Sequence, residues 1–304
     1  MAYKLKSSTP MFGKAISDLM IKPGLAPVFE TPDAFGLDYE DVTFTTDDNV
    51  TLSGWLVKGA TDKVIVQSHF GVQCSRCGFT LEGKGMMERM LWNDDIHFLN
   101  QAKYLVDAGY SVLMYDFRNH GDSGQGASEW IKWGQDERKD VVAAVDYVSN
   151  RPEYQNASIG LLSICMGAAS STFAFGLEEK MSSFPNLKAM VAVQPLTYDN
   201  FVNNLGLPKF LLNQGTRYSI NKRDIDLTGE SFLPFVKDIS VPTLVIQNQN
   251  DPMTNLDMVN QFYKDLKVEK DLIMLDLEKK RAAAYDWIGK NPDRILGWFG
   301  QHMG

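Results

Sequence analysis

The sequence contains few cysteines and histidines: of its 304 residues, three are Cys and four are His. Three thiols cannot all pair within one chain, which argues against the disulfide framework of many secreted proteins. The first ten residues, MAYKLKSSTP, lack the apolar segment and cleavage site of a secretory signal. No apolar run approaches the ~18 residues needed to span a bilayer. We therefore expect a cytoplasmic protein with no membrane partner.

A basic surface is also missing, since acidic residues outnumber basic ones and the formal net charge is −8. Proteins that bind nucleic acid usually carry clustered Lys and Arg on one face, so we expect no nucleic-acid partner. Cys74 and Cys77 form a C-x2-C pair, but no second pair and no nearby His pair completes a zinc site. We expect no metal and no cofactor, and we interpret both cysteines as small apolar side chains in a loop. Nothing in the sequence indicates an oligomeric state.

Short apolar, β-branched runs separated by helical stretches are abundant, which is the pattern of βα units in a mostly parallel sheet. Residues 41–46 and 50–57 alternate around Asp47-Asp48-Asn49 and predict a hairpin of antiparallel edge strands. Buried strands are predicted at residues 63–68, 111–116, 158–162, 188–193, 243–247 and 271–276.

Amphipathic helices are predicted between these strands, because apolar residues recur at helical spacing around residues 141–148 and 256–266. Residues 196–239 interrupt the pattern with Asn, Gly, aromatic and charged residues. A structureless loop of that length is uncommon in a compact domain, so this segment predicts a small cap insertion. We expect residues 1–304 to form a single α/β domain that carries this cap.

The turn Ser163-Ile164-Cys165-Met166-Gly167 follows a predicted strand and precedes a predicted helix. Small residues on both sides of a central nucleophile allow a sharp turn that pushes its side chain outward. The positive end of the following helix would stabilise a Cys165 thiolate. The sequence therefore predicts Cys165 as a nucleophile.

Further motifs follow other predicted strands, at the edge of a parallel sheet where ligands bind. His69-Phe70-Gly71 follows the strand at 63–68, and Asp116-Phe117-Arg118-Asn119-His120-Gly121-Asp122-Ser123 follows the strand that ends at 116. Asp251 follows the strand at 243–247 in the sequence Gln-Asn-Gln-Asn-Asp-Pro. A polar turn of this kind needs its backbone groups satisfied, so we assign His120 a packing and hydrogen-bonding role.

In this order the motifs resemble those of the α/β-hydrolase superfamily over residues 63–252, and the cysteine at the turn is similar to that of dienelactone hydrolases. The resemblance implies an α/β-hydrolase fold with a mostly parallel central sheet flanked by helices. It also implies that Asp251 is the acid of a catalytic triad. The oxyanion donors would be the backbone N–H of Met166 and that of Phe70 or Gly71.

The base of this triad is missing, because the segment after the last predicted strand, Leu-Glu-Lys-Lys-Arg-Ala, contains no histidine. His69 and His97 both lie in the long connection after the strand at 63–68, so each is a candidate for a relocated base; His97 is expected to open a helix. Lys279, Lys280 and Arg281 could supply positive potential to a thiolate, although a solvated loop is the expectation for such a run.

We therefore expect an acyl-transfer enzyme that hydrolyses an ester, thioester or lactone through a Cys165 acyl-enzyme. Two alternatives stay open without the usual histidine. One is acyl transfer or cyclisation by the same nucleophile, and the other is a non-catalytic descendant that binds a small ligand. Apolar and aromatic residues in the segment 196–239 suggest a hydrophobic or aromatic acyl substrate, although core packing explains them equally well.

Overall fold

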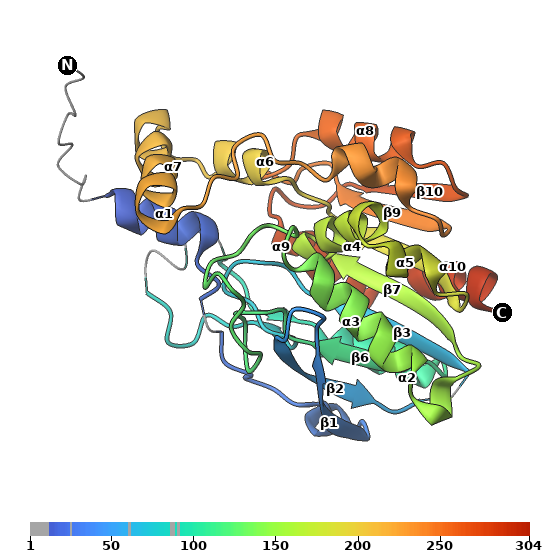
Figure 1. Cartoon of the computed structure of the whole chain (residues 1–304). Coiled ribbons are helices and arrows are strands. Elements are labelled where there is room, and N and C mark those ends of the chain that lie inside the picture. The colour runs from blue at the N-terminus through green and yellow to red at the C-terminus, as the bar shows by residue number, and fades with distance from the viewer. Residues whose placement is uncertain (1–11, 25, 60–61, 86–88, 90–91) are drawn as a thin grey trace, which may run out of the picture.

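The computed structural model describes residues 12–24, 26–59, 62–85, 89 and 92–304. Eight strands form one twisted sheet in the order β1-β2-β6-β3-β7-β8-β9-β10 (Figure 1). β2 is antiparallel to both of its neighbours, and all other pairs are parallel. The strands of this sheet are β1 (Tyr39–Thr45), β2 (Thr51–Val57), β3 (Lys63–Ser68), β6 (Ser111–Tyr115), β7 (Ser158–Ile164), β8 (Leu187–Val193), β9 (Thr243–Asn248) and β10 (Lys270–Leu275).

The predicted strands correspond to these strands with small shifts at their ends. The run at 63–68 matches β3, and the hairpin around residues 47–49 joins β1 to β2. The expectation that both hairpin strands lie at the edge is wrong for β2, since it pairs with β6 on its other side. Trp55, Leu56 and Val57 explain this position, because β2 buries them on both of its faces.

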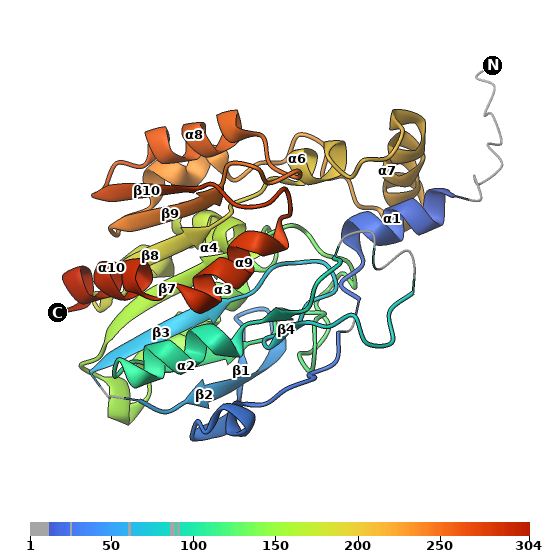
Figure 2. The same ribbon diagram turned by 180° about the vertical axis from the view of Figure 1, so that it is seen from behind.

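Helices cover both faces of the sheet. α3 (Arg138–Ser149), α4 (Met166–Leu177) and α8 (Leu256–Asp265) lie on the face seen in Figure 1. The opposite face, seen in Figure 2, carries α2 (Leu99–Asp107), α9 (Ala282–Lys290) and α10 (Asp293–Met303). The shorter elements are η1 (Pro32–Phe35), η3 (Pro152–Tyr154), α5 (Glu179–Ser183) and a separate antiparallel pair, β4 (Gly78–Phe79) with β5 (Ile96–His97).

The insertion between β8 and β9 contains α6 (Tyr198–Asn203), α7 (Lys209–Arg223) and η4 (Leu233–Asp238). Only part of it projects from the sheet, because η4 packs against α4 and α8. α7 packs instead against the N-terminal helix α1 (Gly13–Ile21), at the upper left of Figure 1. Ser17 and Ser219 share a 2.6 Å hydrogen bond there, so α1 packs against the insertion, a contact that the sequence pattern did not predict.

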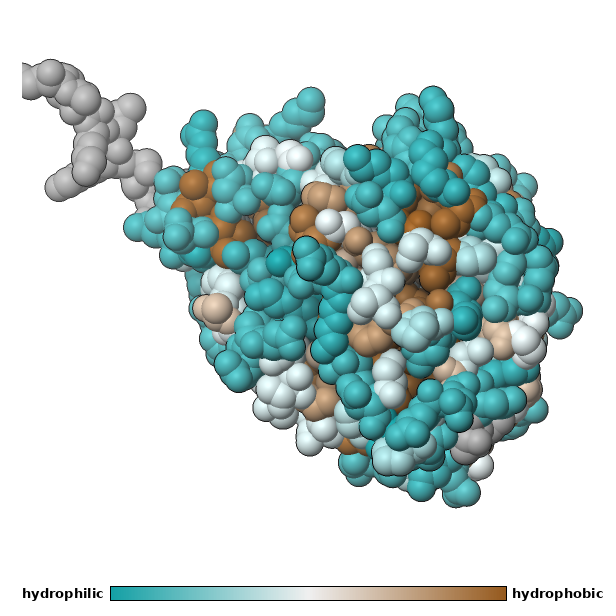
Figure 3. Space-filling model, turned by 45° about the vertical axis from the view of Figure 1, so that its right-hand side comes forward, coloured by the Kyte–Doolittle hydropathy of each residue, from teal (hydrophilic) through white to brown (hydrophobic). Residues whose placement is uncertain are grey.

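One cluster of buried apolar side chains extends from α1 through the strands to α10. On the face shown in Figure 3, apolar residues appear in small patches among hydrophilic ones. Phe201 in the insertion is buried against Trp133 with ring centroids 4.5 Å apart, whereas Phe210 is 62% exposed. No helix in the described part of the chain is long and apolar enough to cross a membrane.

Candidate active site

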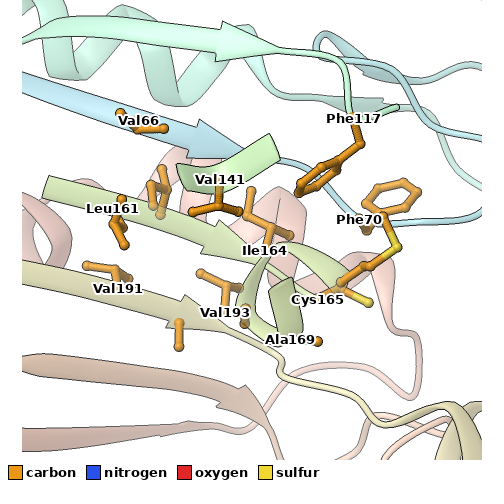
Figure 4. Packing of buried hydrophobic residues seen from close by; sticks show 14 of the residues in the cluster. Val66, Phe70, Phe117, Val141, Leu161, Ile164, Cys165, Ala169, Val191 and Val193 are labelled. Carbon is orange, nitrogen blue, oxygen red and sulfur yellow. The ribbon is translucent and has the colours of Figure 1, made fainter. Parts of the chain in front are cut away.

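Cys165 lies in the turn between β7 and α4, with φ 54° and ψ −106°. A positive φ is strained for a residue with a side chain and costs roughly 1–3 kcal/mol. The surrounding structure must impose it, and it aims the side chain away from the sheet at the carboxyl end of β7. Figure 4 shows Cys165 just beyond Ile164, and Phe70 beyond the end of the neighbouring strand β3. Only 4% of Cys165 is exposed.

The turn is held close to the loop after β3 by two glycines. A Cβ at Gly167 would lie 2.6 Å from the Ser68 carbonyl oxygen, and the Gly167 N–H donates to the His69 carbonyl at 3.2 Å. A Cβ at Gly71 would lie 2.9 Å from the Met166 sulfur. Glycine is therefore required at position 167 for the start of α4 to approach the loop.

Backbone donors are available beside Cys165. Met166 begins α4, where the first N–H groups have no partner within the helix. Among the described residues, the N–H groups of Gly71 and Met166 donate to no backbone carbonyl, whereas the N–H of Phe70 interacts with the Cys74 sulfur. These are the donors that the sequence motifs suggested for an oxyanion hole.

Asp251 is buried in the loop after β9, where several donors hold its carboxylate. It accepts from the Met253 N–H at 2.9 Å and from the Thr254 hydroxyl at 2.6 Å. Its Oδ2 also pairs with the guanidinium of Arg281. The partner of this carboxylate is therefore an arginine, at the place where the resemblance leads one to expect a histidine.

Arg281 follows β10 and is only 3% exposed, so the expectation that this charged run is solvated is wrong for Arg281. Its Nη1 donates to Thr254 at 3.0 Å and its Nη2 donates to the Gln194 carbonyl at 2.7 Å. The Gln194 side chain returns a bond of 2.8 Å to the Arg281 carbonyl. Burial of the cation is compensated by Asp251 and these acceptors. Lys279 is exposed, and Lys280 pairs with Asp94 at 3.2 Å.

Tyr285 lies one turn further along α9, and its ring centroid is 5.7 Å from the Arg281 guanidinium carbon. Its hydroxyl and the Nε of Arg281 are both buried and have no hydrogen-bond partner with good geometry among the described residues. Burial, and then the neighbouring Cys165, raise the pKa of Tyr285, while Arg281 opposes the rise. Asp251 and then Cys165 raise the pKa of Arg281 against the effect of its burial. Arg281 and Tyr285 therefore both face the Cys165 sulfur.

His69 directly follows β3, and both of its ring nitrogens are engaged with backbone groups. Nδ1 donates to the Phe70 carbonyl at 2.6 Å, and Nε2 accepts from the Phe117 N–H at 3.1 Å. Burial, and secondarily His120, hold the pKa of His69 well below its usual range. Neither nitrogen is left to accept a proton from Cys165. His120 is also fully buried, between the carbonyls of Arg118 and Gly71.

His97 lies on β5 and does not open a helix, because α2 begins at Leu99. Its side chain is 42% exposed and its Nδ1 is 2.9 Å from a Glu30 carboxylate oxygen. Of the two candidates for a relocated base, one is thus bound to the backbone and the other faces an acidic partner at the surface. His302 packs on Trp298 in α10.

Cys74 and Cys77 are completely buried beside Ser75, in the loop that precedes β4. Burial raises the pKa of both thiols. Within the described ranges, no group of three or more His, Cys, Asp or Glu side chains is arranged to hold a metal ion. Both side chains fill space in this loop.

Sequence reasoning did not single out Gln194 or Tyr285. Gln194 directly follows β8, so the rule that residues after strand ends gather at one edge would have found it. Tyr285 lies four residues after Arg281, on the same face of a helix. No local signal separated Arg281 from the two lysines before it.

The comparisons with known proteins rest on structure alone, because no protein-family model and no curated protein matches the sequence. An esterase from Pyrococcus furiosus superposes with a TM-score of 0.68 at 23% identity, over 94% of this chain and 99% of the other. An α/β-hydrolase from a Penicillium species gives 0.57 at 17% identity, over 88% and 99%. A dienelactone hydrolase from Anabaena variabilis gives 0.54 at 14% identity, over 88% and 99%. The sheet order, the antiparallel β2 and these similarities establish that the chain has the α/β-hydrolase fold.

Proposed function

We propose that this protein is an acyl-transfer enzyme in which Cys165 attacks the carbonyl carbon of an ester, thioester or lactone. The observation that carries the proposal is the strained backbone of Cys165 at the turn into α4, directly before the unpaired N–H of Met166. Strain of this kind is typical of functional sites, where surrounding packing maintains it. A buried cysteine that only fills space gains nothing from a positive φ.

The reaction would form a bond from sulfur to the carbonyl carbon and move the C=O π electrons onto oxygen. The N–H of Met166 and that of Phe70 or Gly71 would donate hydrogen bonds to this oxyanion. Collapse of the intermediate expels the leaving group and leaves the acyl group on Cys165. Water then gives hydrolysis, and an alcohol, amine or thiol gives transfer or cyclisation.

Arg281, which pairs with Asp251 where a histidine base was expected, favours a second candidate function. A guanidinium cannot serve as a general base, so a protein that binds a small acyl ligand without turning it over also fits the pairing of Arg281 with Asp251. In either case we propose a small, hydrophobic or aromatic acyl compound as the ligand. The two functions differ in whether a covalent bond to Cys165 forms.

Intact mass spectrometry after mixing with p-nitrophenyl butyrate tests the proposal. We expect one butanoyl group per chain, located on Cys165 by peptide mapping, and a matching burst of p-nitrophenolate. Cys165→Ala should abolish both, whereas the matched control Cys77→Ala removes another buried thiol and should retain both. Absence of acylation in the folded parent, with the ester still bound, would favour the ligand-binding function instead.

A further inference from the structure

Arg281 occupies the position from which a histidine would activate the nucleophile. Its guanidinium forms an ion pair with the carboxylate of Asp251. Cys165 is among the neighbours that raise the pKa of both Arg281 and Tyr285. The triad is therefore replaced by a nucleophile, a fixed cation and a phenol. Such a site can favour an anion, but it cannot take up a proton.

We propose that Arg281, assisted by Tyr285, keeps Cys165 as a thiolate, and that the site consequently accepts acyl thioesters in preference to alkyl esters. This inference rests on the proposed function and names its substrate class. In this proposal Arg281 and Tyr285 are catalytic residues, because each would donate to the reacting sulfur. Gln194 and Asp251 are positioning residues, because they act through Arg281.

The hydrogen bonds of Arg281 leave its Nε–H unused. Nη1 serves Asp251 and Thr254, Nη2 serves Gln194, and the buried Nε–H has no acceptor with good geometry among the described residues. The buried Tyr285 hydroxyl is in the same situation. A buried donor without a partner costs about 1–3 kcal/mol. A thiolate on Cys165 accepts from both groups, whereas a neutral thiol is a weak acceptor.

The charged groups around Cys165 also support the proposed thiolate. Arg281 stays protonated because its pKa is raised, and Asp251 from the loop after β9 pairs with it. Tyr285 and Cys74 face the same region from α9 and from the loop after β3, and burial raises the pKa of each. Both remain neutral near pH 7, so neither competes with Cys165 for the unused donor of Arg281.

The chemistry that this site can perform moves no proton. The thiolate adds to the carbonyl carbon of R–CO–S–R′, and the π electrons move to oxygen and are held by the backbone N–H groups. The C=O bond then re-forms as the C–S bond to the leaving group breaks, and R′S⁻ departs with the electron pair. Thiols have a pKa of about 8.5, so R′S⁻ leaves readily without protonation.

An alkyl ester requires one more step. Its alkoxide is about as basic as hydroxide, whose conjugate acid has a pKa of about 15.7, so the oxygen must be protonated as it leaves. Arg281 retains its proton and Tyr285 is a poor acid, so the described side chains next to Cys165 offer no suitable donor. Loss of general acid catalysis typically costs about 10²–10⁴-fold in rate. The same argument predicts that acyl-Cys165 is resolved faster by a second thiolate than by water.

Single-turnover acylation of the unmodified protein tests the substrate class. The probes are butanoyl N-acetylcysteamine thioester, p-nitrophenyl butyrate and ethyl butyrate, and each rate is divided by the rate of the same compound with free N-acetylcysteine thiolate. We expect the three ratios to be similar, because the free thiolate also lacks a positioned general acid and this site adds none. An ethyl ester ratio higher than the other two by about 10²-fold or more, the size of a general acid contribution, would show that a proton donor is present and would overturn the inference.

Variants of Arg281 and Tyr285 test whether these residues increase the reactivity of Cys165. The rate of Cys165 alkylation by iodoacetamide should fall at least about tenfold at pH 7 in Arg281→Gln, and its pH profile should move to higher pH, since a nearby cation favours the thiolate. Arg281→Lys should retain part of the effect. Tyr285→Phe removes only the unpartnered hydroxyl and should move the profile in the same direction by less.

Arg281→Gln leaves the Asp251 carboxylate buried without its cation and will destabilise the fold. The double variant Asp251→Asn, Arg281→Gln removes both charges and keeps the test available in a folded protein. An unchanged alkylation profile in that variant would refute the role of Arg281, and acyl-Cys165 formed at the parent rate would leave the proposed function intact. Failure of every probe to acylate Cys165 in the parent would instead refute the proposed function itself.

Discussion

The close contact between α4 and the loop after β3 at Gly167 predicts how much a single added methyl group should destabilise the fold. Gly167→Ala adds a Cβ that would lie 2.6 Å from the Ser68 carbonyl oxygen and 2.9 Å from its Cβ. Ser68 ends β3 and is paired with Ser163 in the sheet, so it cannot move aside cheaply. Gly297→Ala in α10 is the matched control, because nothing lies within 4 Å of the added Cβ there.

Both substitutions gain helix propensity, worth up to about 1 kcal/mol. This contribution is largely common to the two variants, so the difference in their free energies of unfolding isolates the steric conflict at Gly167. Overpacking of this kind costs about 1–3 kcal/mol. We expect Gly297→Ala to be slightly more stable than the parent, and Gly167→Ala to be less stable than Gly297→Ala by about 1–3 kcal/mol.

The clash should also affect the chemistry, since relief of it moves the Met166 N–H relative to the loop that carries Phe70 and Gly71. Loss of one oxyanion donor costs about 10²–10³-fold in rate. Urea denaturation gives the stabilities, and the p-nitrophenolate burst gives the acylation rate of the folded fraction. A Gly167→Ala variant as stable as Gly297→Ala, with the parent rate, would refute the packing argument.

Three further outcomes are expected. Limiting iodoacetamide should label Cys165 before Cys74 or Cys77, because burial raises the pKa of the latter two; peptide mapping decides this. Cys165→Ser should lose at least about 10²–10⁴-fold in acylation rate, since a hydroxyl needs the missing base. His69 has a lowered pKa, so the unfolded chain protonates first and stability should fall by up to ~1.4 kcal/mol per pH unit below about 6.5. His69→Gln should flatten that slope in urea titrations, and an unchanged slope would contradict it.

The sheet could be predicted from the sequence because its strands are nearly continuous apolar runs. The run predicted at 158–162 lies in β7, which buries Ile159, Leu161 and Leu162. β5 was missed because it is two residues long, and His97 next to an apolar run also reads as a helix start. The contact between α1 and α7 joins segments about 200 residues apart, which no local pattern reports.

The candidate site was predictable only in part. Cys165 follows from its local turn, because small neighbours and a strand-to-helix change are readable in a few residues. Arg281 does not, because its role depends on Asp251 and on the Gln194 carbonyl, which are distant in sequence. A cationic loop and a buried ion pair have the same composition, and only the tertiary partners decide between them.

The two hydrogen bonds between Gln194 and Arg281 also constrain which residues position 281 can accept. A single change of Arg281 to histidine would offer at most two N–H donors on a shorter side chain. The guanidinium at present satisfies Asp251, Thr254 and the Gln194 carbonyl together. Each buried acceptor left without its donor would cost about 1–3 kcal/mol, a large part of the margin of a typical domain. A histidine at position 281 would therefore require changes in the acceptors around it as well.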